Sequence, residues 1–168
     1  MPVLIRPESL ADAPAIFGVT EAAFRTAAHS AGTEQFIVKA LRRAGALAVS
    51  LIAELDGSVI GHVAVSPVTV SDGSPGWYGL GPISVLPQHQ RSGVGSKLML
   101  AALQALRELG AAGCMLVGDP EYYRRFGFEA ATGLTYPGVP PEYFMAVSFG
   151  PPLPHGVANF HEGFAATS

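Results

Sequence analysis

Residues 79–98 read Gly79-Leu80-Gly81-Pro82-Ile83-Ser84-Val85-Leu86-Pro87-Gln88-His89-Gln90-Arg91-Ser92-Gly93-Val94-Gly95-Ser96-Lys97-Leu98. This stretch predicts an apolar strand, a proline-bounded exit, a glycine-rich turn and the start of an amphipathic helix. A turn of this kind leaves several backbone N–H groups free at a helix start, where the helix dipole also favours negative charge. We therefore interpret it as a phosphate-binding turn.

The chain before this stretch predicts an antiparallel meander of three strands. Residues 48–55 and 58–70 are rich in β-branched and apolar residues, and Asp56-Gly57 separates them. Asp-Gly between two such runs indicates a hairpin, because both turn positions favour a positive φ. A second turn at 72–76 leads into the strand at 77–85, which completes the meander.

The chain after this stretch predicts a parallel crossover. The helix is expected to run to about Leu109 and to be followed by a short buried strand at 114–117. A strand–helix–strand unit of this kind is parallel and right-handed. The face expected to be buried consists of Leu98, Ala102, Ala105, Leu106 and Leu109.

The remaining segments extend this α/β pattern toward both ends. No repeat or long linker divides the 168 residues, so we expect one domain over 1–168, with a core at 3–149 and a surface-packed extension at 150–168. The other predicted elements are a strand at 3–6, helices at 12–24 and 33–43, a helical turn at 121–125, and strands at 126–130 and 143–149.

Composition narrows the functional classes. Hydrophobic residues make up 49% and charged residues 14%, which indicates a globular chain. A net charge of −3 gives no general attraction to nucleic acid or to an anionic membrane, and no apolar run is long enough to span one. The single cysteine, Cys114, allows no internal disulfide; it favours a cytoplasmic location and reads as an inert core thiol.

Two better-known phosphate loops do not match the glycine-rich turn. A Walker loop needs Gly-Lys-Ser/Thr, and Gly95-Ser96-Lys97-Leu98 does not supply it. The dinucleotide fingerprint needs a third glycine and an early β-α-β unit, whereas a meander comes first here.

The order of elements and two motifs make the chain resemble the GNAT acetyltransferase superfamily, in the branch called YhbS-like. The motifs Gln/Arg-x-x-Gly-x-Gly/Ala and Tyr-x-x-x-Gly-Phe are matched by Gln90, Gly93 and Gly95 and by Tyr123, Gly127 and Phe128. The resemblance covers about residues 3–149. It implies an α/β (α+β) GNAT fold, in which an antiparallel meander is followed by a parallel strand pair that splays around the cofactor.

The resemblance implies acetyl-CoA as cofactor and no metal. Its pyrophosphate would take the N–H groups of the turn, and its pantetheine arm would pair with the neighbouring strand as an added strand. A free N–H near Val85 would polarise the thioester carbonyl, which is worth about 3 kcal/mol in the transition state. The cofactor-binding residues implied are Ile83, Ser84, Val85, Gln90, Arg91, Ser92, Gly93, Val94, Gly95 and Ser96.

Tyr123 is the proton donor that the resemblance implies. A phenol with a pKa of ~10 can protonate a departing thiolate of pKa ~8.5 because collapse of the intermediate creates a strong transient base beside it. Tyr122 is the adjacent candidate. The structural alternative for both tyrosines is packing beside Phe126 and Phe128.

The general base is left open by the sequence. The strand at 77–85 contains no carboxylate, and an ordered water chain is one alternative. His62 lies on an otherwise apolar strand and reads more simply as a hydrogen-bonded core histidine. The polar candidates are Glu34, Glu54, His62, Ser84 and Asp119.

The predicted function is transfer of an acetyl group to a primary amine of a small molecule or peptide by direct attack. The alternatives are a catalytically silent acyl-CoA-binding module, used for sensing or assembly, and a nucleotide-binding module unrelated to CoA. Homodimers are common in the superfamily and are a further implied partner. Possible walls of the acceptor site are Phe24, His29, Thr33, Phe36, Tyr136 and Tyr143.

Overall fold

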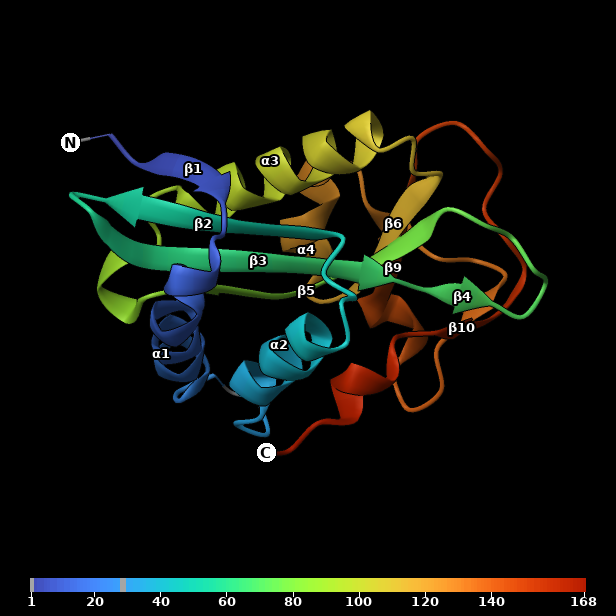
Figure 1. The fold of residues 1–168 in the computed structure, drawn as a ribbon. Helices are drawn as coiled ribbons and strands as arrows, with labels where there is room; N and C mark the ends of the chain where they lie inside the picture. Colours follow the sequence, from blue (N-terminus) through green and yellow to red (C-terminus); the bar gives the residue numbers. More distant parts are fainter. Residues whose placement is uncertain (1, 28–29) are drawn as a thin grey trace.

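A seven-stranded mixed sheet forms the centre of the molecule, as Figure 1 shows for a computed structural model that describes residues 2–27 and 30–168. Helices α1 (Ala13–Phe24) and α2 (Glu34–Arg43) cover one face, and α3 (Val94–Glu108) covers the other. In order across the sheet, the strands are β1 (Leu4–Pro7), β2 (Val49–Leu55), β3 (Ser58–Pro67), β5 (Trp77–Val85), β6 (Gly113–Val117), β9 (Phe144–Ser148) and β7 (Glu129–Ala130).

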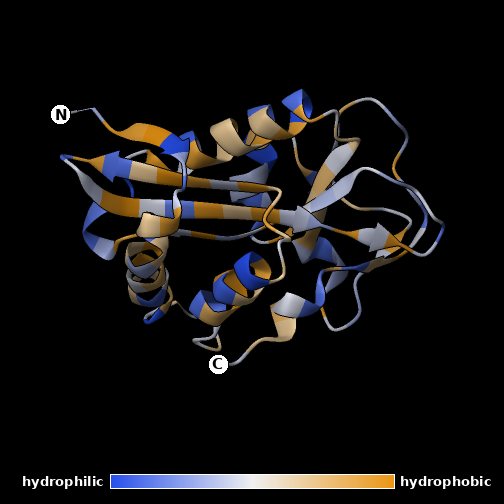
Figure 2. Ribbon diagram, viewed as in Figure 1, coloured by the Kyte–Doolittle hydropathy of each residue, from blue (hydrophilic) through white to orange (hydrophobic). Residues whose placement is uncertain are grey.

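The meander and the crossover confirm the predicted topology. Asp56 and Gly57 have φ values of 51° and 81°, as a tight hairpin requires, and β2, β3 and β5 pair antiparallel. Beyond α3, β6 pairs parallel to β5. Figure 2 shows the apolar residues that run along β2 and β3 and the hydrophilic residues on α2. The sheet is therefore buried between two helical layers.

The apolar run at 58–70 is two strands rather than one. β3 ends at Pro67, and β4 (Thr69–Val70) leaves the main sheet to pair with β10 (Gly156–Asn159). Because proline has no N–H, it cannot donate to a ladder and commonly marks such a break. β10 also pairs parallel to β8 (Leu134–Thr135), which gives a second, three-stranded sheet.

Several predicted boundaries were wrong by a few residues. Leu109 follows the last residue of α3 and is 58% exposed, while Met99 and Leu103 complete the buried face. The predicted strand at 126–130 is reduced to β7, because Phe126 belongs to a 3-10 turn that ends at Gly127 with a φ of 94°. Thr33 precedes α2 without making a side-chain capping bond.

A β-bulge in β5 opens the centre of the sheet. Val63 lies opposite Ile83 and Val65 opposite Leu80, so one residue of β3 faces two of β5. A bulge of this kind bends its strand. The pairing of β5 with β6 stops at Gly79 and Met115, and the two strands diverge beyond that point. The predicted splay is therefore present, and the bulge provides a physical cause for it.

The C-terminal segment folds back onto the sheet and α2. Val157 N–H donates to the Ser71 hydroxyl oxygen at 2.8 Å, and the short 3-10 turn η5 (Glu162–Ala165) packs on α2. The Phe160 ring lies against β5, where a Cβ on Gly79 would be only 2.5 Å from its Cε2 atom. Among the described residues, no helix combines the length and apolar character needed to cross a membrane.

Candidate active site

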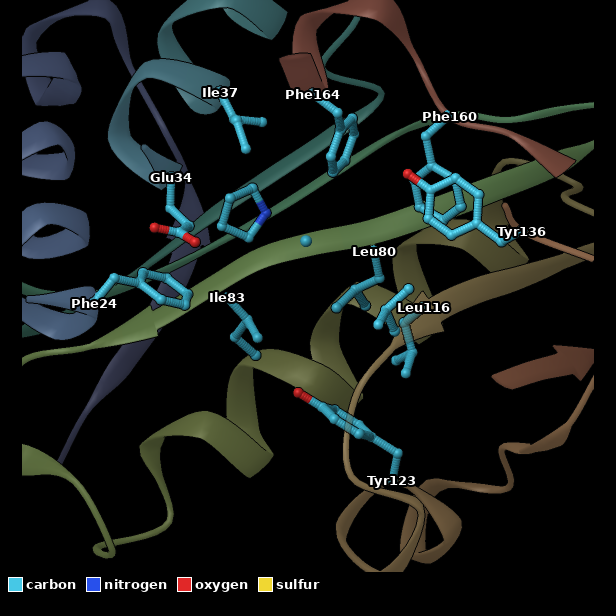
Figure 3. Close-up of a pocket in the computed structure, with 13 residues that line it drawn as sticks. Phe24, Glu34, Ile37, Leu80, Ile83, Leu116, Tyr123, Tyr136, Phe160 and Phe164 are labelled. Carbon is cyan, nitrogen blue, oxygen red and sulfur yellow. The ribbon is translucent and has the colours of Figure 1, made fainter. Parts of the chain in front are cut away.

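A cavity of about 330 Å³ occupies the gap between β5 and β6. Figure 3 shows lining residues on both sides of β5, with Tyr123 on one side and Glu34 and Phe24 on the other. The cavity therefore connects the two faces of the sheet. Its described lining residues are Phe24, Glu34, Ile37, Leu80, Gly81, Pro82, Ile83, Leu116, Val117, Tyr123, Tyr136, Phe160 and Phe164.

The glycine-rich turn presents free backbone donors at the start of α3. Gly93 precedes the helix with a φ of 89°, and the first hydrogen bond that closes onto it comes from Lys97 N–H at 3.1 Å. In the described part of the chain, no hydrogen bond is donated by the backbone N–H groups of residues 94–96. Three convergent donors at the positive end of a 15-residue helix favour an anionic ligand.

Side chains within the turn hold it against β5. The Gln90 side-chain amide donates to the Val85 carbonyl oxygen at 3.0 Å, and the Ser92 hydroxyl donates to the His89 carbonyl oxygen at 2.5 Å. Arg91 has a φ of 62°, which is uncommon for a residue with a side chain. Gln90 thus shapes the turn through the end of the strand that enters the cavity.

The backbone N–H and C=O groups of alternate residues of β5 point toward the gap. Leu86 N–H donates to the Ile60 carbonyl oxygen of β3 at 2.9 Å. In an antiparallel pair, successive residues point their backbone N–H and C=O groups alternately toward the partner strand and away from it. The amide groups of Ile83 and Val85 therefore face the gap. Ser84 faces β3, and its hydroxyl is buried 3.4 Å from that of Thr20, so the structure does not bring this residue to the gap.

Tyr123 is held at the cavity by its neighbours. It ends α4 (Pro120–Tyr123), which Asp119 caps by accepting a hydrogen bond from Glu121 N–H at 3.0 Å. A Cβ on Gly118 would overlap the Tyr123 ring, and the Phe128 ring lies 6.3 Å away between centroids. Burial, with smaller contributions from Tyr122 and Asp119, raises the pKa of Tyr123 to about 12.

Tyr122 occupies a different environment from its neighbour. Its ring does not line the cavity; it lies under the Arg125 guanidinium at 4.4 Å and packs edge-on against Phe126 at 5.5 Å. The two tyrosine rings pack edge-on with centroids 4.9 Å apart, but of the two only Tyr123 lines the cavity, while the Tyr122 hydroxyl lies 3.4 Å from where a Cβ on Gly95 would stand.

Among the polar candidates for a base, only Glu34 lines the cavity. Its Oε1 atom accepts a hydrogen bond from the Ser30 hydroxyl at 2.6 Å. Glu54 is paired with Arg6 at 3.0 Å on β2, and Asp119 is used in the cap of α4.

His62 is a core residue. It is fully buried on β3, and its Nε2 atom lies 2.7 Å from the Ser50 hydroxyl and 3.5 Å from Glu8 Oε1. Burial lowers the pKa of His62, and the nearby Glu8 carboxylate opposes this only in part. Cys114 is likewise buried, and burial raises the pKa of its thiol, so it is not a nucleophile.

The predicted acceptor walls are brought together only in part. Phe24 and Tyr136 line the cavity, whereas Phe36 packs against Phe17 with centroids 5.6 Å apart. Thr33 and Tyr143 do not line it, and His29 lies outside the described residues. The cavity is also lined by three residues that were not predicted from the sequence: Ile37, Phe160 and Phe164. The available signal was a pair of phenylalanines four residues apart in a tail otherwise rich in proline and glycine.

Comparison with known proteins agrees with this geometry. The chain is 49% identical to a GNAT family acetyltransferase from Brucella melitensis, crystallised in complex with acetyl-CoA, over 97% of this chain and 98% of that one, with a TM-score of 0.87. The YhbS structure from Escherichia coli, in complex with CoA, is 33% identical over 99% and 93% of the two chains, with a TM-score of 0.85.

Sequence comparison alone also identifies YhbS as a relative. The uncharacterized N-acetyltransferase YhbS of Escherichia coli (strain K12) is 38% identical over 130 residues, which is 77% of this chain and 75% of YhbS. The model of the acetyltransferase (GNAT) family matches residues 15–128. The match to the family model, the 38% identity to YhbS and the shared fold show that this chain belongs to the GNAT family of acetyltransferases.

Proposed function

We propose that this chain transfers an acetyl group from acetyl-CoA to a primary amine, with Tyr123 as general acid. The observation that carries the proposal is the cavity through the sheet, which is lined by both Tyr123 and Glu34. The turn before α3, which leads to the free amides, is held to the end of β5 by the bond from Gln90. The complexes of two similar proteins with acetyl-CoA and CoA support the choice of cofactor.

The residues present fit this cofactor. The N–H groups of residues 94–96 would hold the pyrophosphate, within the predicted set 91–96, and Gly95 leaves space because it has no side chain. The gap-facing amides of Ile83 and Val85 would pair with the pantetheine arm as an added strand does. The Val85 carbonyl already accepts from Gln90, so its N–H is the group left to face the thioester.

The thioester supplies the acetyl group and a thiolate leaving group. In the proposed reaction Glu34 accepts one proton from the ammonium, so that the nitrogen lone pair is free to form the new C–N bond. Val85 N–H donates to the carbonyl oxygen as it gains negative charge. As the C–S bond breaks, the nitrogen gives its second proton to water and Tyr123 gives its proton to the sulfur; water then reprotonates the phenolate, and Glu34 returns its proton to solvent. The products are an amide, a free thiol and one proton released to solvent.

Ligand-dependent stability tests the cofactor assignment. We expect saturating CoA to raise the melting temperature by several degrees, since a ligand at 100 times its Kd adds about 2.7 kcal/mol to the free energy of unfolding. ATP and NAD at the same concentration serve as controls and should add much less. Stabilisation by ATP or NAD without stabilisation by CoA would favour the unrelated nucleotide-binding module instead.

Turnover separates an enzyme from a sensor. Thiol release from acetyl-CoA, followed with a panel of primary amines, should exceed the rate without amine. If CoA binds tightly and no amine accelerates thiol release, the silent acyl-CoA-binding module is the correct function.

A further inference from the structure

We propose that the acceptor is a small primary amine that carries an apolar or aromatic group and has no carboxylate beside the nitrogen. The inference rests on the proposed function for the reaction, but it concerns the acceptor half of the cavity and can be tested by binding alone. Three features of that half carry it: among the described residues its lining includes one carboxylate and no cation, and it has an aromatic wall.

The carboxylate of Glu34 provides the site for an ammonium group. Glu34 is the only Asp or Glu among the described residues that line the cavity. Its Oε1 atom is fixed by the Ser30 hydroxyl at 2.6 Å, and Gly32 N–H in turn donates to the Ser30 oxygen at 2.9 Å. Within the described chain, the Oε2 atom has no hydrogen bond or ion pair, which leaves it available to an amine.

The lining offers no partner for a carboxylate on the substrate. No arginine, lysine or histidine belongs to the described residues that line the cavity. Arg25, one residue beyond Phe24, lines a separate pocket and pairs with Glu21 at 3.5 Å. An amino acid would bring its own carboxylate into an apolar gap that already contains Glu34. Such a group is costly to bury unpaired, and like charges repel.

In Figure 3, three aromatic rings lie together, across the cavity from Glu34 and Phe24: Tyr136, Phe160 and Phe164. The Tyr136 and Phe160 rings stack with centroids 4.8 Å apart and an interplanar angle of 25°, and Phe164 meets Phe160 edge-on at 5.2 Å. Such a wall can bury an apolar side group, and aromatic faces also attract an ammonium group.

The volume limits the size of the acceptor. At about 330 Å³, the cavity lies at the lower end of the range of about 300–1,000 Å³ that is typical of small-molecule sites. The end of the pantetheine arm must share this space. The part of the acceptor that enters the cavity is therefore small, with one ring or a short alkyl chain.

A matched pair of probes tests the inference. 2-Phenylethylamine and L-phenylalanine differ only by the carboxylate, and ethanolamine keeps the amine but lacks the apolar group. We expect calorimetric titration of the full chain, with and without CoA, to give 2-phenylethylamine a Kd about 10- to 100-fold lower than that of L-phenylalanine. Ethanolamine should also bind at least about tenfold more weakly than 2-phenylethylamine, because it buries little apolar surface.

Substitution of Glu34 tests the assigned contact. Glu34→Gln keeps the shape and the Ser30 bond but removes the charge, so 2-phenylethylamine should lose about tenfold or more in affinity while L-phenylalanine changes little. Glu108→Gln, on the exposed end of α3 beside Gln104, is the matched control and should change neither Kd. If Glu34 had only a structural role, Glu34→Gln would weaken the binding of both probes equally.

The outcomes separate this inference from the proposed function. Equal or tighter binding of L-phenylalanine or ethanolamine overturns the inference, even if CoA binds and turnover occurs. Failure of CoA to bind overturns the proposed function, while the titrations without CoA still decide the acceptor class. Absence of binding by 2-phenylethylamine under both conditions overturns the inference as well.

Discussion

The Tyr123 phenol is a weak acid in a fixed place. Its pKa of about 12 keeps it protonated at neutral and moderately alkaline pH, and Gly118 leaves room for its ring. Against a free thiolate of ordinary pKa ~8.5 this transfer is uphill, so the proton can move to the sulfur only while the C–S bond is breaking, and the phenolate regains it readily from solvent. The residue is thus suited to act once and then to recover its proton from solvent.

Removal of this hydroxyl tests the assignment. We expect Tyr123→Phe to lower kcat by about 10²-fold or more, with little change in CoA affinity, because the ring packing on Phe128 is kept. Tyr143→Phe, at an exposed tyrosine that does not line the cavity, is the matched control and should leave kcat near that of the unchanged protein. Steady-state kinetics of thiol release would show the difference, and an equal loss in both variants would contradict the role of Tyr123.

Some residues of the site could be predicted from the sequence and others could not. Tyr123 could be placed because it stands in a motif at a fixed distance from Gly127. Glu34 was only one of five open candidates, because its position in the cavity depends on how α2 packs beside the bulged strand. Phe160 and Phe164 were missed, since nothing local in the tail shows that it returns to β5.

At the level of elements, the turn before α3 depends on the conformation of Gly93. Its φ of 89° is unfavourable for a residue with a Cβ, and the space around its Cβ direction is open. We expect Gly93→Val to raise the Kd for CoA about tenfold or more, because a side chain would strain the turn that presents the helix amides. Isothermal titration with CoA measures this loss.

Gly73→Val is a matched control for the same strain. Gly73 has a φ of 82° in the exposed turn after β4, with equally open space around it. Both variants should lose about 1–2 kcal/mol in the free energy of unfolding, but only the change at Gly93 should weaken CoA binding. Equal CoA affinity in the two variants would place the cofactor elsewhere.

Elements were predicted more accurately than their irregularities. The alternation and turn residues at 48–85 define the meander, and the glycine-rich turn defines the start of α3. The bulge at Gly81 and Pro82 was not predicted, because a bulge is a mismatch between two strands and is absent from the pattern of either one. That Ser84 faces β3 and not the gap depends on the register between these two strands, which only the structure supplies.

Across the whole molecule, partly buried ionisable groups join the first segment to α2, through Glu8 and Arg42, and to β2, through Arg6 and Glu54. Arg42 pairs with Glu8 at 2.8 Å, and Arg6 pairs with Asp12 at 2.9 Å. Hydrogen bonds from Arg6 and from the Ser9 backbone lower the pKa of Asp12 to about 2. Bonds from His62, Arg42 and Ser50 lower the pKa of Glu8 despite the opposing effect of burial, which on its own would raise it.

These shifts predict that stability falls in acid. Carboxyl groups with lowered pKa values stabilise the fold above their ordinary range and lose that contribution as the pH falls below about 4. A buried histidine with a lowered pKa acts in the same direction, because below its ordinary value of 6.5 only the unfolded chain takes up the proton. In a pH series the melting temperature should therefore decrease from pH 6.5 to 5 because of the histidine, and decrease again below about pH 4 because of the carboxyl groups.

His62→Gln isolates the histidine contribution. Glutamine retains a group that can bond Ser50 but does not titrate, so the decrease between pH 6.5 and 5 should become smaller while the decrease below pH 4 remains. An unchanged slope between pH 6.5 and 5 would show that His62 does not contribute to it.

The returning C-terminal segment has a consequence for the shape of the cavity. Phe160 and Phe164 shape the acceptor cavity, yet both lie beyond the residues 15–128 that define the family. The groups proposed to handle the thioester, from Ile83 to Tyr123, all fall inside that region. Changes in a short C-terminal segment can therefore reshape the aromatic wall of the cavity without altering Glu34 or the groups from Ile83 to Tyr123.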